Sequence, residues 1–172
     1  MNVANLGTKE SIVRRSIGCA VVALSIAMIP GAALAQSAKS VGGAGRAVLP
    51  SGASWKGVPL SGLRFGTGVT FAGPGVAKGT LQTTLLSIPV NGVTRQIRVT
   101  GEVTAGSSPA GGPSTFSGLG TVDPGDGTPA LLSVPFSLTV SGASGGPPTL
   151  TLTLDGQTLP AAVLSAGNVV IN

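Results

Sequence analysis

Histidine and tyrosine are absent from this chain, and cysteine occurs once, at Cys19. Aromatic residues amount to only 3% of the composition, as four phenylalanines and one tryptophan. Without histidine, the Ser-His and Cys-His pairs of nucleophilic catalysis are excluded. A single thiol cannot form an intramolecular disulfide or a thiolate metal cluster. These shortages leave little from which to build a catalytic centre, and we expect no enzyme activity.

Acidic residues are also scarce. The chain has five, and four of them lie beyond residue 35: Glu102, Asp123, Asp126 and Asp155. Glycoside hydrolysis uses two carboxylates, for which Asp123/Asp126 and Glu102/Asp155 are the available pairs. Sugar clefts also use aromatic platforms, and this chain has almost no aromatic residues to supply them. The sequence therefore disfavours a hydrolase and indicates no catalytic residue and no cofactor-binding residue.

The first 35 residues have the pattern of a cleaved signal peptide. An apolar run of about 13 residues fits the ~7–15 of a signal sequence and is shorter than the ~20 that span a bilayer. Cys19 opens this run, whereas a lipoprotein cysteine closes it. The small-x-small pattern at residues 33–35 predicts cleavage between Ala35 and Gln36. A basic segment precedes the run: Lys9, Arg14 and Arg15, followed by Ile17–Ile29.

Export directed by this signal, followed by cleavage, would place residues 36–172 in the periplasm, at the cell surface or in the medium. The cysteine would leave with the leader, so the mature domain must be stable without disulfides. No second apolar run of spanning length follows, and we expect no transmembrane span after cleavage. Seven Lys/Arg face four acids in the mature part, a net charge of +3. Because these charges are scattered singly and have no interleaved aromatics, they favour a solvated surface and no nucleic-acid partner.

The rest of the chain has the alternation of an all-β domain. Val, Leu, Ile and Phe make up about 27% of the mature residues, above the ~20% needed to bury a core. Runs with a period of two alternate with Gly/Pro-rich turns. We predict a two-layer antiparallel β-sandwich of about seven to nine short strands over residues 58–172. Residues 36–57 are predicted to be a flexible Gly/Ser-rich lead-in that holds one short edge strand.

The alternation also assigns faces. Asn91-Gly92 and Asp155-Gly156 are predicted hairpin turns. Between Val93 and Val99 we expect a strand with Arg95 at a sheet rim. The Thr/Leu strand over residues 149–154 is the strand best suited to be an exposed edge. Four phenylalanines are predicted to be buried, and four threonines exposed: Phe65, Phe71, Phe116 and Phe136, against Thr70, Thr139, Thr151 and Thr153.

Three pairs of short segments recur in the same order, at offsets of 45, 46 and 41 residues. The pattern predicts two tandem half-repeats of about 45 residues, neither stable alone. The matched segments are residues 70–75 with 115–120, residues 85–90 with 131–136, and residues 99–101 with 140–142.

The loop over residues 123–128 is the one place with concentrated polar chemistry. Asp123 and Asp126 are weak calcium candidates, since glycines beside them would let backbone carbonyls join as oxygen ligands. Two carboxylates do not fill six to eight oxygen positions, and a structural turn is the favoured interpretation. The six residues resemble the Asp-x-Gly-Asp-Gly-Thr loop of PKD-type β-sandwich domains on extracellular proteins. The aromatic strand that follows this loop in such domains has no match here, and we assign no family.

The sequence thus predicts a non-catalytic structural or binding module, secreted or exposed at the cell surface. The alternative is a small exported β-barrel or sandwich that carries an apolar ligand. A core filled by the four phenylalanines would oppose that alternative. No partner is indicated directly; self-association through strand edges and contact with cell-envelope components are the interactions expected of such a module.

Overall fold

The computed structural model describes residues 39–89, 92–142 and 146–172 and confirms an all-β protein in these ranges. The chain divides into two units after Ala35, and the described residues belong to the second, Gln36–Asn172. The predicted signal peptide and its cleavage site lie outside the described residues. In the ranges that are described, no helix is long and apolar enough to cross a membrane. The ten strands found there are β1 (Lys39–Val48), β2 (Ser54–Trp55), β3 (Val58–Gly73), β4 (Val76–Ser87), β5 (Gln96–Ser107), β6 (Ser114–Asp123), β7 (Leu131–Ser141), β8 (Thr149–Leu154), β9 (Gln157–Thr158) and β10 (Ala162–Ile171).

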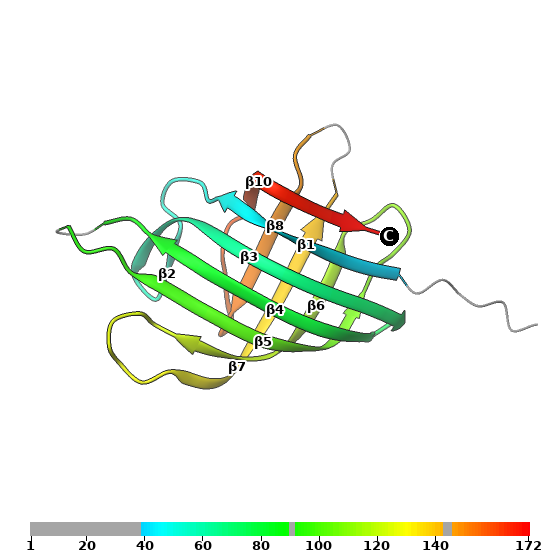
Figure 1. Ribbon diagram of the computed structural model, residues 1–172, viewed down its shortest axis with the longest axis horizontal. Coiled ribbons are helices and arrows are strands. Elements are labelled where there is room, and N and C mark those ends of the chain that lie inside the picture. The colour runs from blue at the N-terminus through cyan, green and yellow to red at the C-terminus, as the bar shows by residue number, and fades with distance from the viewer. Residues whose placement is uncertain (1–38, 90–91, 143–145) are drawn as a thin grey trace, which may run out of the picture. The chain divides into compact units, whose positions relative to one another are not determined.

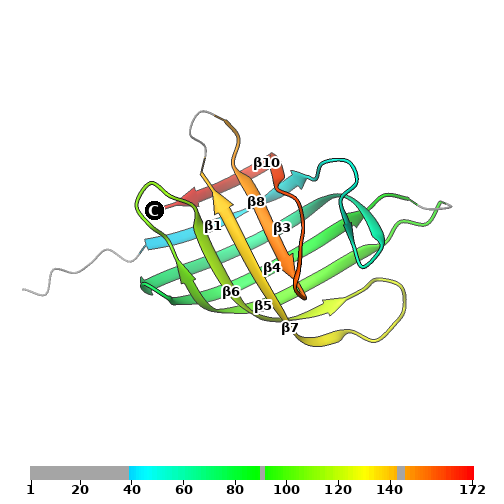
Figure 2. The same cartoon turned by 180° about the vertical axis from the view of Figure 1, so that it is seen from behind.

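The long strands form one antiparallel sheet that closes on itself. Neighbours follow the order β10, β8, β7, β6, β5, β4, β3, and β1 then pairs with both β3 and β10 (Figure 1). Seen from behind, β6, β7 and β8 cross in front of β3 and β4 (Figure 2). The predicted two-layer sandwich is not confirmed, because a sandwich has two separate sheets and these strands share one continuous ladder. We call this assembly the closed sheet.

Strand β1 lies where the sequence predicts a flexible lead-in. Ala44 in its centre pairs with Asn168 of β10 and with Gly66 of β3, so β1 is not an edge strand. A Cβ atom on Gly43 or Gly45 would overlap the backbone of β10. The glycines that suggest flexibility are therefore the residues that allow close approach, and pairing on both sides outweighs their low strand propensity.

The predicted inward faces are confirmed. All four phenylalanines are at most 5% exposed and lie inside the closed sheet. The predicted exposure of the threonines holds for Thr70 alone, since Thr139, Thr151 and Thr153 are half-buried. These three point outward from the middle of the sheet. There Thr139 lies opposite Thr151 and hydrogen-bonds the Thr115 hydroxyl at 3.0 Å, so neighbouring side chains cover them.

The ring of Phe136 takes space that glycines leave empty on neighbouring strands. Gly118 of β6 lies directly opposite Phe136 of β7, and Gly101 belongs to β5. A Cβ atom on Gly101 would overlap the Phe136 ring, and one on Gly118 would overlap the backbone of β5. An aromatic ring packed over strand glycines fills the gap that missing side chains would leave at a bend.

One of the two predicted hairpin turns is confirmed, and the other lies partly outside the described residues. Asp155 and Gly156 have φ values of 53° and 75°, which confirms a type I′ turn between β8 and β9. Of the predicted Asn91-Gly92 turn the structure describes only Gly92, which has a φ of 77°; β4 ends at Ser87 and β5 begins at Gln96. Asn91 itself lies outside the described residues. Val93, predicted in the strand, precedes β5 and is 63% exposed.

Strand β8 is not the exposed edge that the sequence predicts. Its whole length pairs with β7 on one side. On the other side Leu150 pairs with Ala162 of β10, the amide of Leu159 donates to the Leu152 carbonyl at 2.8 Å, and Leu154 pairs with Gln157 of β9. The backbone of β8 is therefore occupied on both sides.

The three matched segment pairs do not fall on equivalent strands. The first members of the three pairs lie towards the end of β3, at the end of β4 and within β5; they are residues 70–75, 85–90 and 99–101. In the second set, residues 115–120 lie within β6, and the other two matches both fall on β7 or just beyond its end. Three strands in one set correspond to two in the other, so the sequence similarity is not matched by a repeated arrangement of strands.

Candidate functional site

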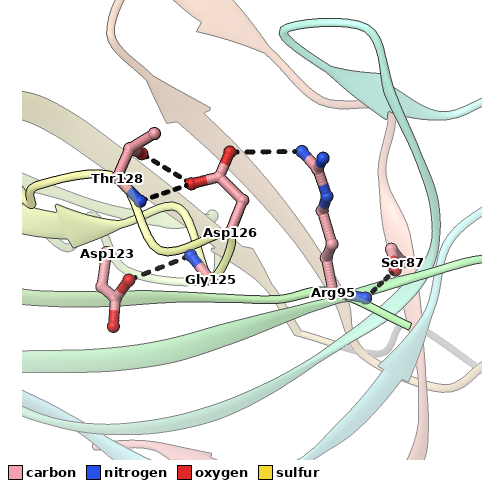
Figure 3. A network of polar contacts seen from close by, with 6 residues as sticks. All are labelled: Ser87, Arg95, Asp123, Gly125, Asp126 and Thr128. Carbon is pink, nitrogen blue, oxygen red and sulfur yellow. Dashed lines mark hydrogen bonds and ion pairs between the residues drawn. The ribbon is translucent and has the colours of Figure 1, made fainter. Parts of the chain in front are cut away.

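The loop from Asp123 to Thr128 follows β6 and has the contacts of a structural turn (Figure 3). The Asp123 Oδ1 atom accepts a hydrogen bond from the Gly125 amide at 2.9 Å. The Asp126 Oδ1 atom accepts from the Thr128 amide at 3.1 Å and from the Thr128 hydroxyl at 2.6 Å. Gly125 and Gly127 have φ values of 67° and 85°, the left-handed region that glycine adopts without strain. Both aspartates thus act as turn residues, as the sequence favours.

Arg95 joins this loop to the end of β4. Its guanidinium Nη1 lies 3.3 Å from Asp126 Oδ2, and its backbone amide donates to the Ser87 hydroxyl at 2.6 Å. Hydrogen bonds from the Thr128 hydroxyl and amide, with the charge of Arg95, hold the pKa of Asp126 below its ordinary value. Arg95 is exposed and lies just before β5, which agrees with the predicted rim position.

The carboxylates do not gather into a metal-binding cluster in the part of the chain that the structure describes. Among the described residues, no three His, Cys, Asp or Glu side chains lie close enough to hold an ion together. Glu102 lies on β5, and Asp155 directly follows β8. The strands β6 and β7 lie between β5 and β8 in the sheet. Asp155 is paired with the ammonium of Lys56 at 2.5 Å. The Asp123 and Asp126 carboxylates accept hydrogen bonds within their own loop, and the strands β6 and β7 separate Glu102 from Asp155.

A different set of charged residues comes together on the outer face of the closed sheet. Arg46 of β1 lies directly opposite Arg64 of β3, Arg64 opposite Thr84 of β4, and Thr84 opposite Arg98 of β5. The row ends at Asp123 of β6, opposite Arg98. All three arginines are exposed. We call Arg46, Arg64, Thr84 and Arg98 the arginine row.

The flanks of the arginine row carry no charge. On one side the aligned outward residues are Ala44, Gly66, Gln82 and Thr100; on the other they are Val48, Gly62, Leu86 and Gln96. Within the described ranges, the ion pairs involve Lys56 and Arg95, and none involves an arginine of the row. Like charges directly opposite each other on a sheet are destabilising. The arginine row therefore concentrates positive charge on this face, and the opposite charge next to it is that of Asp123 at its end.

Two adjoining hollows lie on the same outer face. The first, of about 330 Å³, is lined by Arg64, Arg98, Thr84 and Gln82 among others. The second, of about 700 Å³, shares Gln82 and Thr100 with it and contains Glu102. A β-bulge borders the second hollow: Leu132 and Ser133 both stand opposite Thr121, and Ser133 has a φ of 55°. Leu132, 74% exposed, belongs to its lining.

No pattern in the sequence predicts the arginine row. Read along the chain, its arginines are isolated charges at residues 46, 64 and 98. They meet only through the register of four strands, and one of these, β1, is not predicted as a full strand. Outward alternation would place each arginine on the outer face, but alternation alone does not show which residues lie opposite one another.

No family model, no curated protein and no solved structure matches this chain. The resemblance of residues 123–128 to a PKD-type loop thus stays confined to those six residues.

Proposed function

We propose that this protein is an exported, non-catalytic binding module that acts through the outer face of its closed sheet. The contrast between the two faces carries this proposal. Phenylalanine and aliphatic side chains fill the inner face. On the outer face, arginine, threonine and glutamine side chains line the first hollow, and threonine, glutamine, glutamate and leucine side chains line the second. Export is part of the proposal and is supported by the basic segment, apolar run and cleavage pattern of residues 1–35.

The buried phenylalanines favour a binding module over a carrier of an apolar ligand. A carrier needs an interior space of several hundred Å³ that is free for the ligand. Here Phe65, Phe71, Phe116 and Phe136 point into that interior. A ligand would have to displace aromatic side chains that form the core, whereas binding on the outer face leaves the core intact.

Expression of the full chain with a C-terminal tag, followed by cell fractionation, tests this proposal. We expect the protein in the periplasm, at the surface or in the medium, with an intact mass that starts at Gln36. We also expect it to sediment with washed cell-envelope fragments at low salt. Unprocessed protein in the cytoplasm would overturn export, and a mass that retains Cys19 would overturn cleavage. Extraction of one apolar molecule per chain would establish the carrier instead.

A further inference from the structure

We infer that the arginine row binds a linear polymer of phosphate groups that lacks nucleobases. This inference rests on the proposed function and deepens it by naming the class of partner. The row crosses β1, β3, β4 and β5, three strand spacings that span roughly 14 Å. A partner that neutralises the whole row must therefore carry several anionic groups in a line.

Phosphate fits the hollow between Arg64 and Arg98 better than carboxylate. A guanidinium fork satisfies both oxygens of one carboxylate in a bidentate pair. A phosphate group offers more acceptor oxygens than one fork can use. Two arginines that line one hollow, with the Thr84 hydroxyl and the Gln82 amide between and beside them, provide donors for these further oxygens.

The neighbouring charges define the direction of the polymer. Glu102 lies outward on β5, four residues beyond Arg98, and Asp123 closes the row on β6. A polyanion that followed β5 towards Glu102 would meet a like charge. A polyanion that crosses from β5 to β1 meets only Thr84, Arg64 and Arg46. The favoured path thus runs across the strands.

Nucleic acid fits this surface less well. Single strands gain about 1–3 kcal/mol for each base that stacks on an aromatic side chain. The four phenylalanines and Trp55 are all buried, so the outer face has no such platform. A polymer that is recognised only through its phosphates needs no exposed aromatic side chain for binding.

Binding of inorganic polyphosphate to the purified exported protein, measured by titration calorimetry at low salt, tests the inference. We expect binding that weakens as salt is added. Arg64→Gln and Arg98→Gln should each weaken binding about tenfold, the typical effect of losing a charge-assisted hydrogen bond. Lys78→Gln is the matched control: Lys78 is exposed on the same face of β4, opposite Thr70, roughly 20 Å along the strand from Thr84. This control should bind within about twofold of the unmodified protein, which separates the row from net charge.

Four outcomes would overturn the inference. These are no binding of polyphosphate, equal weakening by Lys78→Gln, binding of monomeric phosphate as tight as that of the polymer, or tighter binding to single-stranded DNA or anionic phospholipid vesicles than to polyphosphate of equal charge. The thermal midpoint of each variant shows that it is folded. A protein that is exported and sediments with envelope fragments but fails these tests would leave the proposed function standing.

Discussion

At the scale of single residues, the Phe136 ring packs where Gly101 and Gly118 have no side chain. Gly101→Ala places a methyl group where the Phe136 ring lies, and we expect a loss of about 1–3 kcal/mol, as is typical of an overpacked core. Gly66→Ala is the control, because a Cβ there meets open space, and we expect a change within about 0.5 kcal/mol. Urea unfolding measures both. Equal stability of the two variants would contradict this packing.

Residue-scale predictions from the sequence succeed where alternation alone decides them. The inward side of β3, with Phe65 and Phe71, follows from a period of two that no neighbour can change. The exposure of Thr139 and Thr151 could not be predicted in the same way. It depends on which side chains lie beside them across the strands, and alternation contains no information about that.

The contribution of the Asp126 carboxyl group to folding stability is expected to depend on pH. Its pKa is lower in the folded protein than its ordinary value of 3.8, so its contribution to stability is present above that value. The contribution is lost as the pH falls through the lowered folded pKa. Asp126→Asn should therefore be less stable than the unmodified protein at pH 7, with the difference vanishing at the most acidic pH. A constant difference in unfolding midpoint across this range would contradict the assignment.

At the scale of elements, the loop over residues 123–128 is expected to be a turn that needs no calcium. The Asp123 and Asp126 carboxylates already accept hydrogen bonds from Gly125 and Thr128. A ligand at a hundredfold excess over its Kd would add roughly 2.7 kcal/mol of stability. We expect identical melting curves in millimolar calcium and in chelator. A rise of several degrees with calcium, abolished by Asp126→Ala, would establish a calcium site.

The arginine row should reduce the stability of the sheet that carries it. Arg46 and Arg64 lie directly opposite each other, and replacing one removes a like-charge pair. Arg64→Thr should raise stability by about 0.2–1 kcal/mol at low salt, a gain that added salt screens away. Lys78→Thr, opposite the uncharged Thr70, should show no such gain. Chemical unfolding at two salt concentrations measures both, and a loss of stability in Arg64→Thr at low salt would contradict like-charge repulsion.

The bounds of some strands can be predicted from the sequence, and those of others cannot. The strand over residues 149–154 is predicted with its observed bounds, because leucine and threonine alternate there without interruption. Strand β1 is predicted only as a short edge strand in a flexible lead-in, because Gly42, Gly43 and Gly45 indicate flexibility and its full length is ordered by pairing with β3 and β10. The arginine row could not be found for the same reason: Arg46 belongs to β1, and its alignment with Arg64 is set by tertiary pairing.

At the scale of the whole described unit, closure of the sheet depends on β1. Without it, β3 and β10 would each have an unpaired edge, and β10 would keep only its short contact with β8 at Ala162 and Val163. Long-range pairing of this kind orders β1 together with the rest of the sheet. A flexible lead-in would instead open independently of the core.

Hydrogen exchange distinguishes these two possibilities for β1. If β1 closes the sheet, the amides of Val41–Ala47 that pair with β3 or β10 should exchange only through global unfolding, with protection equal to that of β4. The connection over residues 109–112, which precedes β6, provides the internal reference for fast exchange. Native-state exchange of the exported protein, followed by mass spectrometry, measures all three segments together. Amides of β1 that exchange as fast as this connection, while β4 stays protected, would restore the lead-in and leave the sheet open between β3 and β10.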